Sequence, residues 1–409
     1  AGGNPHRVAR DFESFYRAAQ YFDEPQHSIY GFRALPGDPA LTPLFEQFGD
    51  PLNFVEQNRR LQAQMRGLDP EVLKGRFLAP YLYPPTLAAL LQPLSGMALQ
   101  DAHLVWLILI CAALVALPFV AAWSLREAAL LPQLRLDQQS ALWVIVSALA
   151  VAALLIVQLL LLALGLHRRV PSIAGIAFAL ACLIKMSPAI FALYFLRQRA
   201  WRFLIWSAVG AGASVGLTSP GSGWRHWLDF CSAFFEISAG DRVMLGYFPA
   251  GMAGNHSLKG FVHRITPGNA ELLRVLLLYG LLAGMAGWIA LREYRQPDHS
   301  MLFFRLSIAQ LLFSPMTWQA HYVYLWPACL VLAAQIARPG ARSAWQRALI
   351  VLILLLNLSF WPPLNWLTWF APERWMLNGY VVSLKTYLLL LLMFTPDLLR
   401  GETETETAI

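Results

Sequence analysis

Two charged residues of this chain lie where their side chains could do chemistry. Asp11 begins the segment Asp11–Tyr16 (DFESFY), and a carboxylate at a membrane edge can act as a general base on a hydroxyl group. Lys185 lies inside an apolar run, in Ile184–Pro188 (IKMSP). A lysine within the membrane is a candidate functional residue, and its ammonium group suits a phosphate. Each residue also has an ordinary interpretation. Asp11 could be a surface charge, and the Lys185 side chain could simply extend to the membrane surface.

Three further segments combine polar and aromatic residues. Tyr81–Pro85 (YLYPP) is expected to form a rigid entry into the next helix. Proline at the start of a helix is common, so this feature alone does not indicate a function. Asn255–Gly260 (NHSLKG) is followed by Arg264, and Ser314–Tyr322 (SPMTWQAHY) contains His321 at the head of an apolar run. One histidine is weak evidence, but an acid, a lysine, an arginine and a histidine on one face of the membrane would form a candidate site.

The sequence contains no GxxxxGK[ST], GxGxxG or HExxH motif and no Cys/His metal cluster. We therefore expect no nucleotide, cofactor or metal, and an ATP-driven pump is disfavoured. The four cysteines are far apart, and we interpret them as small apolar residues.

The composition indicates a membrane protein. Of 409 residues, 57% are apolar and 13% charged, against roughly 25% charged residues in soluble domains. The mean hydropathy is +0.49. An ordinary soluble enzyme, a disulfide scaffold and a disordered regulator are excluded. The net charge of +7 reflects basic cytoplasmic loops, so no nucleic-acid partner is expected.

The elements that must position these residues are apolar runs. They lie at about 84–99, 104–123, 142–166, 171–196, 203–219, 271–291, 302–314, 321–337, 346–361 and 380–396. Run 171–196 has basic residues on both flanks and Lys185 and Pro188 in its middle, so we predict two half-length helices that meet at these residues. Eleven segments result.

The distribution of charge predicts the sides of the membrane. Loops predicted inside are 167–170, 197–202, 292–301 and 338–345; together with Arg347 they hold ten bases and two acids. Loops predicted outside are 124–141, 220–270 and 362–379, with seven bases and six acids. The difference places residues 1–83 outside. We expect one further membrane helix before Asp11.

Three regions follow from this topology. Residues 1–83 hold 19 of the 55 charges and form an extracytoplasmic first loop, 84–396 form the membrane core, and 397–409 form a cytoplasmic tail. Within loop 220–270 we expect an amphipathic helix at the membrane interface, because five aromatic residues recur at helical spacing: Trp224, Trp227, Phe230, Phe234 and Phe235.

The order of these segments resembles the GT-C superfamily, and most closely glycosyltransferase family 87, which includes mycobacterial mannosyltransferases. Asp11–Tyr16 matches the family's Asp-Phe-x-x-[Phe/Tyr]-Tyr motif, and Tyr83–Thr86 its Tyr-Pro-Pro step. Gly175 to Pro188 matches the lysine helix break, Asn255–Gly260 the Asn-Gln-Ser-Leu-[Arg/Lys]-Gly motif with His256 for Gln, and Ser314–His321 the Ser-Pro-x-[Ser/Thr]-Trp-x-x-His motif. The resemblance implies an all-α, polytopic GT-C membrane bundle of about eleven segments here.

The resemblance also implies a mechanism. A sugar, expected to be mannose, would pass from a polyprenyl phosphate to a lipid or glycan acceptor at the outer face of the cell (inner) membrane, with inversion. Asp11 would be the base, and Lys185, Arg264 and His321 would bind the donor phosphate. The implied substrate-binding residues are Tyr16, Tyr83, Asn255, Ser257, Lys259, Trp318, Gln319 and Tyr322.

Two alternatives remain open. A lipid or sugar flippase would have inverted repeats and a site near the midplane, whereas the sequence has no evident internal repeat and its polar residues cluster on one face. A GT-C relative could instead transfer an arabinose or an aminosugar.

Overall fold

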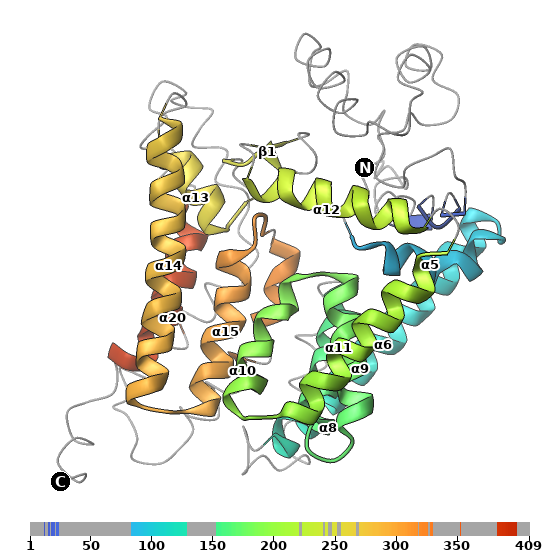
Figure 1. Cartoon of the computed structure of the whole chain (residues 1–409), viewed down its shortest axis with the longest axis horizontal. Coiled ribbons are helices and arrows are strands. Elements are labelled where there is room, and N and C mark those ends of the chain that lie inside the picture. The colour runs from blue at the N-terminus through green and yellow to red at the C-terminus, as the bar shows by residue number, and fades with distance from the viewer. Residues whose placement is uncertain are drawn as a thin grey trace. The chain divides into compact units, whose positions relative to one another are not determined.

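The computed structural model describes most of the predicted membrane core. The residues described are 12, 15–16, 18–20, 22–23, 83–128, 153–220, 223–239, 242–243, 248–251, 255–266, 270–317, 319–325, 328–329, 352 and 383–398. Helices dominate these residues (Figure 1). The strands among them are β1 (Arg242–Val243) and β2 (Phe248–Pro249), which pair antiparallel. The all-α prediction is therefore confirmed for this part of the chain.

Contacts divide the chain into two compact units. Unit 1 comprises Ala1–Ala113, Gly175–Met186 and Trp206–Pro249, and unit 2 comprises the remaining residues. Helices α6 (Leu99–Glu127), α9 (Pro171–Ile184) and α11 (Trp201–Thr218) contribute residues to both units.

Unit 1 contains α5 (Pro85–Ser95) and α12 (Gly223–Ala239). Pro85 begins α5 because its fixed φ suits the first helical position and its missing N–H needs no partner there. Helix α12 confirms the helix predicted within loop 220–270. Trp224 and Leu228, one turn apart, are exposed, whereas His226 and Phe230 are buried, which is the pattern of an amphipathic helix.

Unit 2 is built around α15 (His299–Phe313), in which residues 301–312 are all buried. Around it lie α14 (Glu271–Arg295), α13 (Leu258–Ile265) and α20 (Leu384–Leu398), together with α10 (Ala192–Arg197) and the 3-10 helices η2 (Ser187–Phe191) and η3 (Gln319–Leu325). Helix α8 (Ala153–Leu166) packs on η3. Run 321–337 was predicted to be a membrane helix, but its first five residues, 321–325, belong to the 3-10 helix η3.

The predicted break in run 171–196 is confirmed. Helix α9 ends at Ile184, Lys185 and Met186 are not helical, and η2 and α10 follow. Pro188 lies in the first turn of η2, where its missing N–H costs no hydrogen bond of α9.

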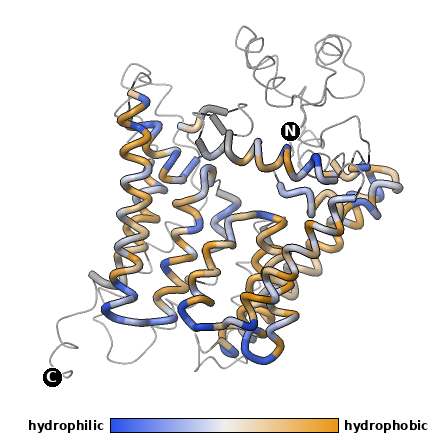
Figure 2. Tube along the Cα trace, in the orientation of Figure 1, coloured by the Kyte–Doolittle hydropathy of each residue, from blue (hydrophilic) through white to orange (hydrophobic). Residues whose placement is uncertain are grey.

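Membrane spans are confirmed only in part. Among the described residues, α14 is long and apolar enough to cross a membrane, and the count rises to three if the bent pairs α5 with α6 and α11 with α12 each form one span. Four shorter apolar helices, in α8, α9, α15 and α20, fall below that length. Figure 2 shows apolar residues along the helices and hydrophilic residues at several connections. The predicted number of eleven segments stays a prediction.

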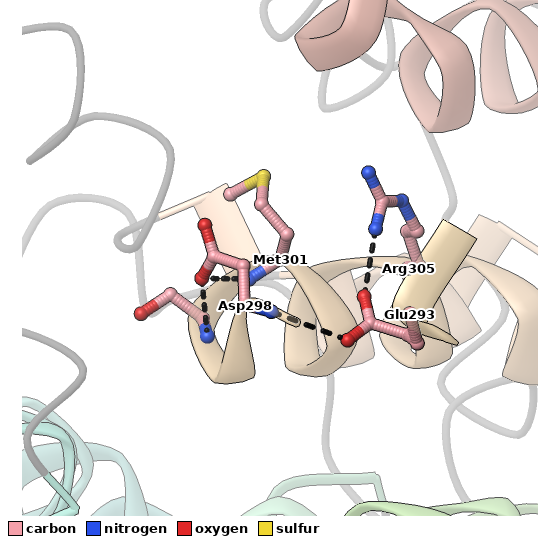
Figure 3. Close-up of polar contacts among 5 residues, drawn as sticks. Glu293, Asp298, Met301 and Arg305 are labelled. Carbon is pink, nitrogen blue, oxygen red and sulfur yellow. Dashed lines mark hydrogen bonds and ion pairs between the residues drawn. The ribbon is translucent and has the colours of Figure 1, made fainter. Parts of the chain in front are cut away.

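Helices α14 and α15 form a hairpin with a polar turn (Figure 3). Asp298 begins α15, and its side chain accepts hydrogen bonds from the backbone N–H groups of Ser300 (2.9 Å) and Met301 (3.1 Å). Nearby, the buried Arg305 donates to Glu293 at 2.8 Å, and its guanidinium lies 5.3 Å from the centre of the Trp288 ring. The ion pair compensates two charges that would be costly to bury singly.

Three of the loops predicted inside lie at the same end of unit 2. His167 shares a hydrogen bond of 3.1 Å with Gln198, and the rings of Tyr194 and His299 are 6.4 Å apart. These contacts join the connections α8–α9, α10–α11 and α14–α15, which Figure 1 shows at the lower end of that unit. The basic residues of these loops therefore gather as the prediction requires.

One side assignment is wrong. Glu127 at the end of α6 pairs with Arg169 at 2.7 Å, although loop 124–141 was predicted outside and loop 167–170 inside. Two charged groups in contact cannot lie on opposite sides of a bilayer. The contact contradicts a single crossing of the bilayer between these two residues, where run 142–166 was counted as one span. Separately, the prediction counted 84–99 and 104–123 as two spans, whereas α5 and α6 meet at a bend of 120°.

Candidate functional site

The predicted site residues fall into three groups. Asp11 and Trp318 lie outside the described residues, as does the side chain of Gln319. Tyr16, Tyr83 and Lys185 belong to unit 1, whereas Asn255, Ser257, Lys259, Arg264, His321 and Tyr322 belong to unit 2. Each group is described separately.

In unit 1, Tyr16 anchors the N-terminal segment to the bend between α5 and α6. Its buried hydroxyl donates to the Met97 carbonyl at 2.6 Å and accepts from Gln20 at 3.0 Å. Tyr83 packs edge-on against Phe15, with ring centres 5.1 Å apart. Lys185 follows α9, and its N–H donates to the Ala181 carbonyl at 3.1 Å. The substrate-binding and phosphate-binding roles of these residues stay predictions.

In unit 2, Asn255 holds two distant segments together. Its side-chain amide donates to the carbonyls of Ala250 (3.0 Å) and Pro315 (3.2 Å), and its side-chain oxygen accepts from the N–H of Thr317 at 3.0 Å. The Thr317 carbonyl in turn accepts from the His256 N–H at 2.8 Å. The two motifs predicted to meet, Asn255–Gly260 and Ser314–Tyr322, therefore do meet.

The same motif begins α13. Ser257 is its N-cap residue and accepts a hydrogen bond from the N–H of Gly260 at 3.1 Å. Gly260 packs directly on Asn255, so that a Cβ at this position would lie 2.8 Å from Asn255 Cγ. The glycine is needed because no side chain fits between α13 and Asn255.

Arg264 ties α13 to the start of α20. Its Nε donates to Ser383 Oγ at 2.8 Å, and Nη1 donates to the Asn255 carbonyl at 2.7 Å. Burial lowers the pKa of Arg264 to about 10, so the side chain stays charged at neutral pH. The residue predicted to bind phosphate thus also has a structural role.

The start of α20 adds a lysine that the sequence prediction missed. Lys385 is buried, and its ammonium lies 5.4 Å from the centre of the Tyr322 ring. Beside it, Thr386 donates to the His256 carbonyl at 3.0 Å. The signal that singled out Lys185, a lysine within an apolar run, also applies to Lys385 in run 380–396.

His256 and Tyr322 line the same cluster with their rings edge-on, 5.8 Å apart between centres. Burial, together with the positive charges of Arg264 and Lys385, lowers the pKa of His256 to about 3, so it is neutral at pH 7. His321 is half-buried, and its ring lies 6.2 Å from that of Tyr324. Lys259 is buried in α13.

The cluster therefore joins the buried cations Arg264 and Lys385 to neutral polar groups of Asn255–Ser257, η3 and α20. Such a set is suited to bind an anion, because cations and hydrogen-bond donors in a low-dielectric site stabilise negative charge strongly. Among the described residues, no group of three or more His, Cys, Asp or Glu side chains could hold a metal ion.

Comparison with known families identifies a match over most of the described core. The family model of Glycosyltransferase family 87 matches residues 81–315. That interval contains the helix break at Lys185, α13 and the first two residues of Ser314–Tyr322. No solved structure matches the chain.

Similar proteins include mannosyltransferases of two mycobacteria. A polyprenol-phosphate-mannose-dependent alpha-(1-2)-phosphatidylinositol mannoside mannosyltransferase of Mycobacterium tuberculosis is 24% identical over 311 residues, which are 70% of this chain and 68% of the relative. A corresponding pentamannoside mannosyltransferase of Mycolicibacterium smegmatis is 30% identical over 202 residues, 47% of each chain. In this second case the chain spans about half the length of the relative.

Proposed function

The chain belongs to glycosyltransferase family 87 and is a glycosyltransferase, and from this premise we propose that it transfers mannose from a polyprenyl phosphate to a lipid or glycan acceptor. The observation that carries the proposal is the family match over residues 81–315. The relatives support the choice of donor, since their names specify polyprenol-phosphate-mannose.

The proposed reaction is a single displacement. The acceptor hydroxyl oxygen attacks the anomeric carbon of the donor, while the bond from that carbon to the phosphate oxygen breaks and its electron pair stays on the phosphate. Asp11 takes the hydroxyl proton, and the configuration at the anomeric carbon inverts. The reaction as proposed requires no metal, because the phosphate is itself a good leaving group once its charge is neutralised.

Cationic side chains supply that neutralisation. In the proposal, Lys185, Arg264 and His321 face the donor phosphate, and electrostatic stabilisation in a site shielded from water supplies much of the rate. Arg264 suits this role because it is held by neutral oxygen acceptors at 2.7 and 2.8 Å and stays charged at neutral pH.

We place the reaction at the outer face of the cell membrane. Helix α15 begins beside the basic connections and is 15 residues long, ending before Ser314, so it separates its two ends by about 22 Å. The segment paired with Asn255 therefore lies at the end away from the basic loops. Basic loops prefer the cytoplasmic side, which supports an extracytoplasmic site.

The test is transfer by the purified protein in liposomes with polyprenyl-phosphate mannose and a phosphatidylinositol mannoside acceptor, with products identified by mass spectrometry. We expect one added hexose of inverted configuration. Asp11→Asn should lower the rate by about 10²- to 10⁴-fold, whereas the matched variant Glu13→Gln should keep it.

Three outcomes would contradict parts of the proposal. Full activity of Asp11→Asn would show that Asp11 is not the base. Addition of a pentose or an aminosugar from another lipid-linked donor, with none of a hexose, would exclude mannose. Donor movement across the bilayer without any sugar transfer would favour the flippase.

A further inference from the structure

Lys385 is a buried cation that the proposed mechanism does not use. It lies in the first turn of α20 and is 5% exposed. A cation is unfavourable there, because the N-terminal end of a helix carries partial positive charge from its unpaired N–H groups. Burial adds a desolvation cost. Lys385 therefore places positive charge, at a costly position, in the same cluster as Arg264, and both charges act on His256.

The backbone around Lys385 is fixed by contacts with the segment Asn255–Arg264. Ser383 accepts from Arg264 at 2.8 Å, and Thr386 donates to the His256 carbonyl at 3.0 Å. Next to them, Tyr387 packs edge-on against Phe261, with ring centres 5.4 Å apart. Residues on both sides of Lys385 are therefore held by α13, which limits where its ammonium can lie.

The groups around the ammonium are suited to an anion. Tyr322 presents its ring to Lys385, and a cation over an aromatic face is stabilised without losing its charge. Within the part of the chain that the structure describes, the Tyr322 hydroxyl and His256 Nδ1 are buried without a hydrogen-bond partner. Buried polar atoms of this kind normally find a partner, and a phosphate oxygen could accept from the hydroxyl.

We propose that Lys385 binds the phosphate of the lipid-linked sugar donor, with Tyr322 beside it, and that Arg264 is also a positioning residue that holds the start of α20. This inference rests on the proposed function, which supplies the phosphate. It assigns to the site a residue from the last described helix, 121 positions after Arg264.

The test compares Lys385→Met, which keeps length but removes charge, with Lys385→Arg. Binding of polyprenyl phosphate is measured directly in nanodiscs, and the KM for polyprenyl-phosphate mannose is measured in the transfer assay. Loss of a hydrogen bond to a charged group predicts about 10- to 100-fold weaker binding and a similar rise in KM for the Met variant. Lys385→Arg should recover part of both.

Matched controls separate charge at this position from charge in general. Arg274→Met removes another cation of unit 2, whose Nε donates to Thr266 at 3.2 Å, and should leave polyprenyl phosphate binding unchanged. Polyprenol, which lacks the phosphate, should bind both variants and the wild type equally. If Lys385→Met does not fold, Lys385→Gln is measured in the same assays with the same expectation.

The outcomes distinguish this inference from the proposed function. If Lys385→Met binds polyprenyl phosphate as tightly as the wild-type protein does, the inference is overturned, even if the wild-type protein transfers mannose. A neutral variant that loses affinity for phosphatidylinositol but not for polyprenyl phosphate also overturns it, since the ligand is then a headgroup. Wild-type protein that binds polyprenyl phosphate but transfers no mannose contradicts the proposed function while leaving the binding role of Lys385 supported.

Discussion

Gly260→Ala is the substitution whose effect the structure determines most directly. The new Cβ would lie 2.8 Å from Asn255 Cγ and 3.0 Å from Asn255 Cβ, and closer still to the Asn255 backbone oxygen. Carbon atoms in contact normally lie about 3.5–4.0 Å apart. Either Asn255 or α13 must therefore move by several tenths of an ångström.

The cost follows from what Asn255 holds. Overpacking alone costs about 1–3 kcal/mol. A displaced Asn255 also strains its bonds to Pro315 (3.2 Å) and Thr317 (3.0 Å), each worth about 1 kcal/mol. The gain in helix propensity from glycine to alanine returns at most about 1 kcal/mol. We expect a net loss of about 2–4 kcal/mol in the free energy of unfolding.

Two other glycines provide a graded control. A Cβ at Gly251 would lie 3.3 Å from His263, a tight contact that small shifts can relieve, whereas at Gly287 in α14 nothing lies within 4 Å. We expect a loss of about 1 kcal/mol or less for Gly251→Ala and no loss for Gly287→Ala. Unfolding in increasing denaturing detergent would rank the three variants. Equal stability of Gly260→Ala and Gly287→Ala would refute the reasoning.

Two further predictions concern buried charge. Arg305→Met leaves the Glu293 carboxylate buried without its partner and should destabilise the protein by about 3–5 kcal/mol, measured in the same detergent titration. The double variant with Glu293→Gln should recover most of that loss, and an unrecovered double variant would show that the charge is not the cause. The second prediction concerns His256, whose pKa is lowered to about 3 in the folded protein. The unfolded chain takes up a proton on this side chain at about pH 6.5, whereas the folded chain does not. The free energy of unfolding should therefore fall as the pH drops below 6.5. Between pH 7 and 5 the contribution is at most about 2 kcal/mol, and His256→Gln should remove it; an unchanged pH profile would contradict the burial of the imidazole.

The candidate site was predictable in its parts. The motif Asn255–Gly260 and the segment Ser314–Tyr322 were expected to act together, and the structure joins them through Asn255 and Thr317. The predicted substrate-binding role was only partly informative, because the Asn255 side chain holds loops together and the Ser257 side chain caps α13. A motif indicates that its residues act together. It does not distinguish residues that contact a substrate from residues that hold those residues in place.

The predictions that failed concern contacts between distant residues, which the local sequence pattern does not specify. Run 84–99 was counted as a span for its apolar character, although it is a little short for one, whereas the bend between α5 and α6 depends on the neighbours of those helices. The contact of Glu127 with Arg169, which contradicts a single crossing between them, likewise depends on the fold. Lys385 was passed over although it lies within the apolar run 380–396; that its segment meets Arg264, 121 positions earlier, depends on the fold.

By itself, the sequence determined that this is a helical chain with a break at Lys185, basic connections and the motifs of glycosyltransferase family 87, because hydropathy, charge and helix-breaking residues act over a few turns. Only the tertiary structure decided which polar groups meet. Asn255, Arg264, Tyr322 and Lys385 come from three segments separated by up to 130 residues. Their convergence depends on the packing of α13, η3 and α20, because burial makes each polar group find its partner across the fold rather than along the chain.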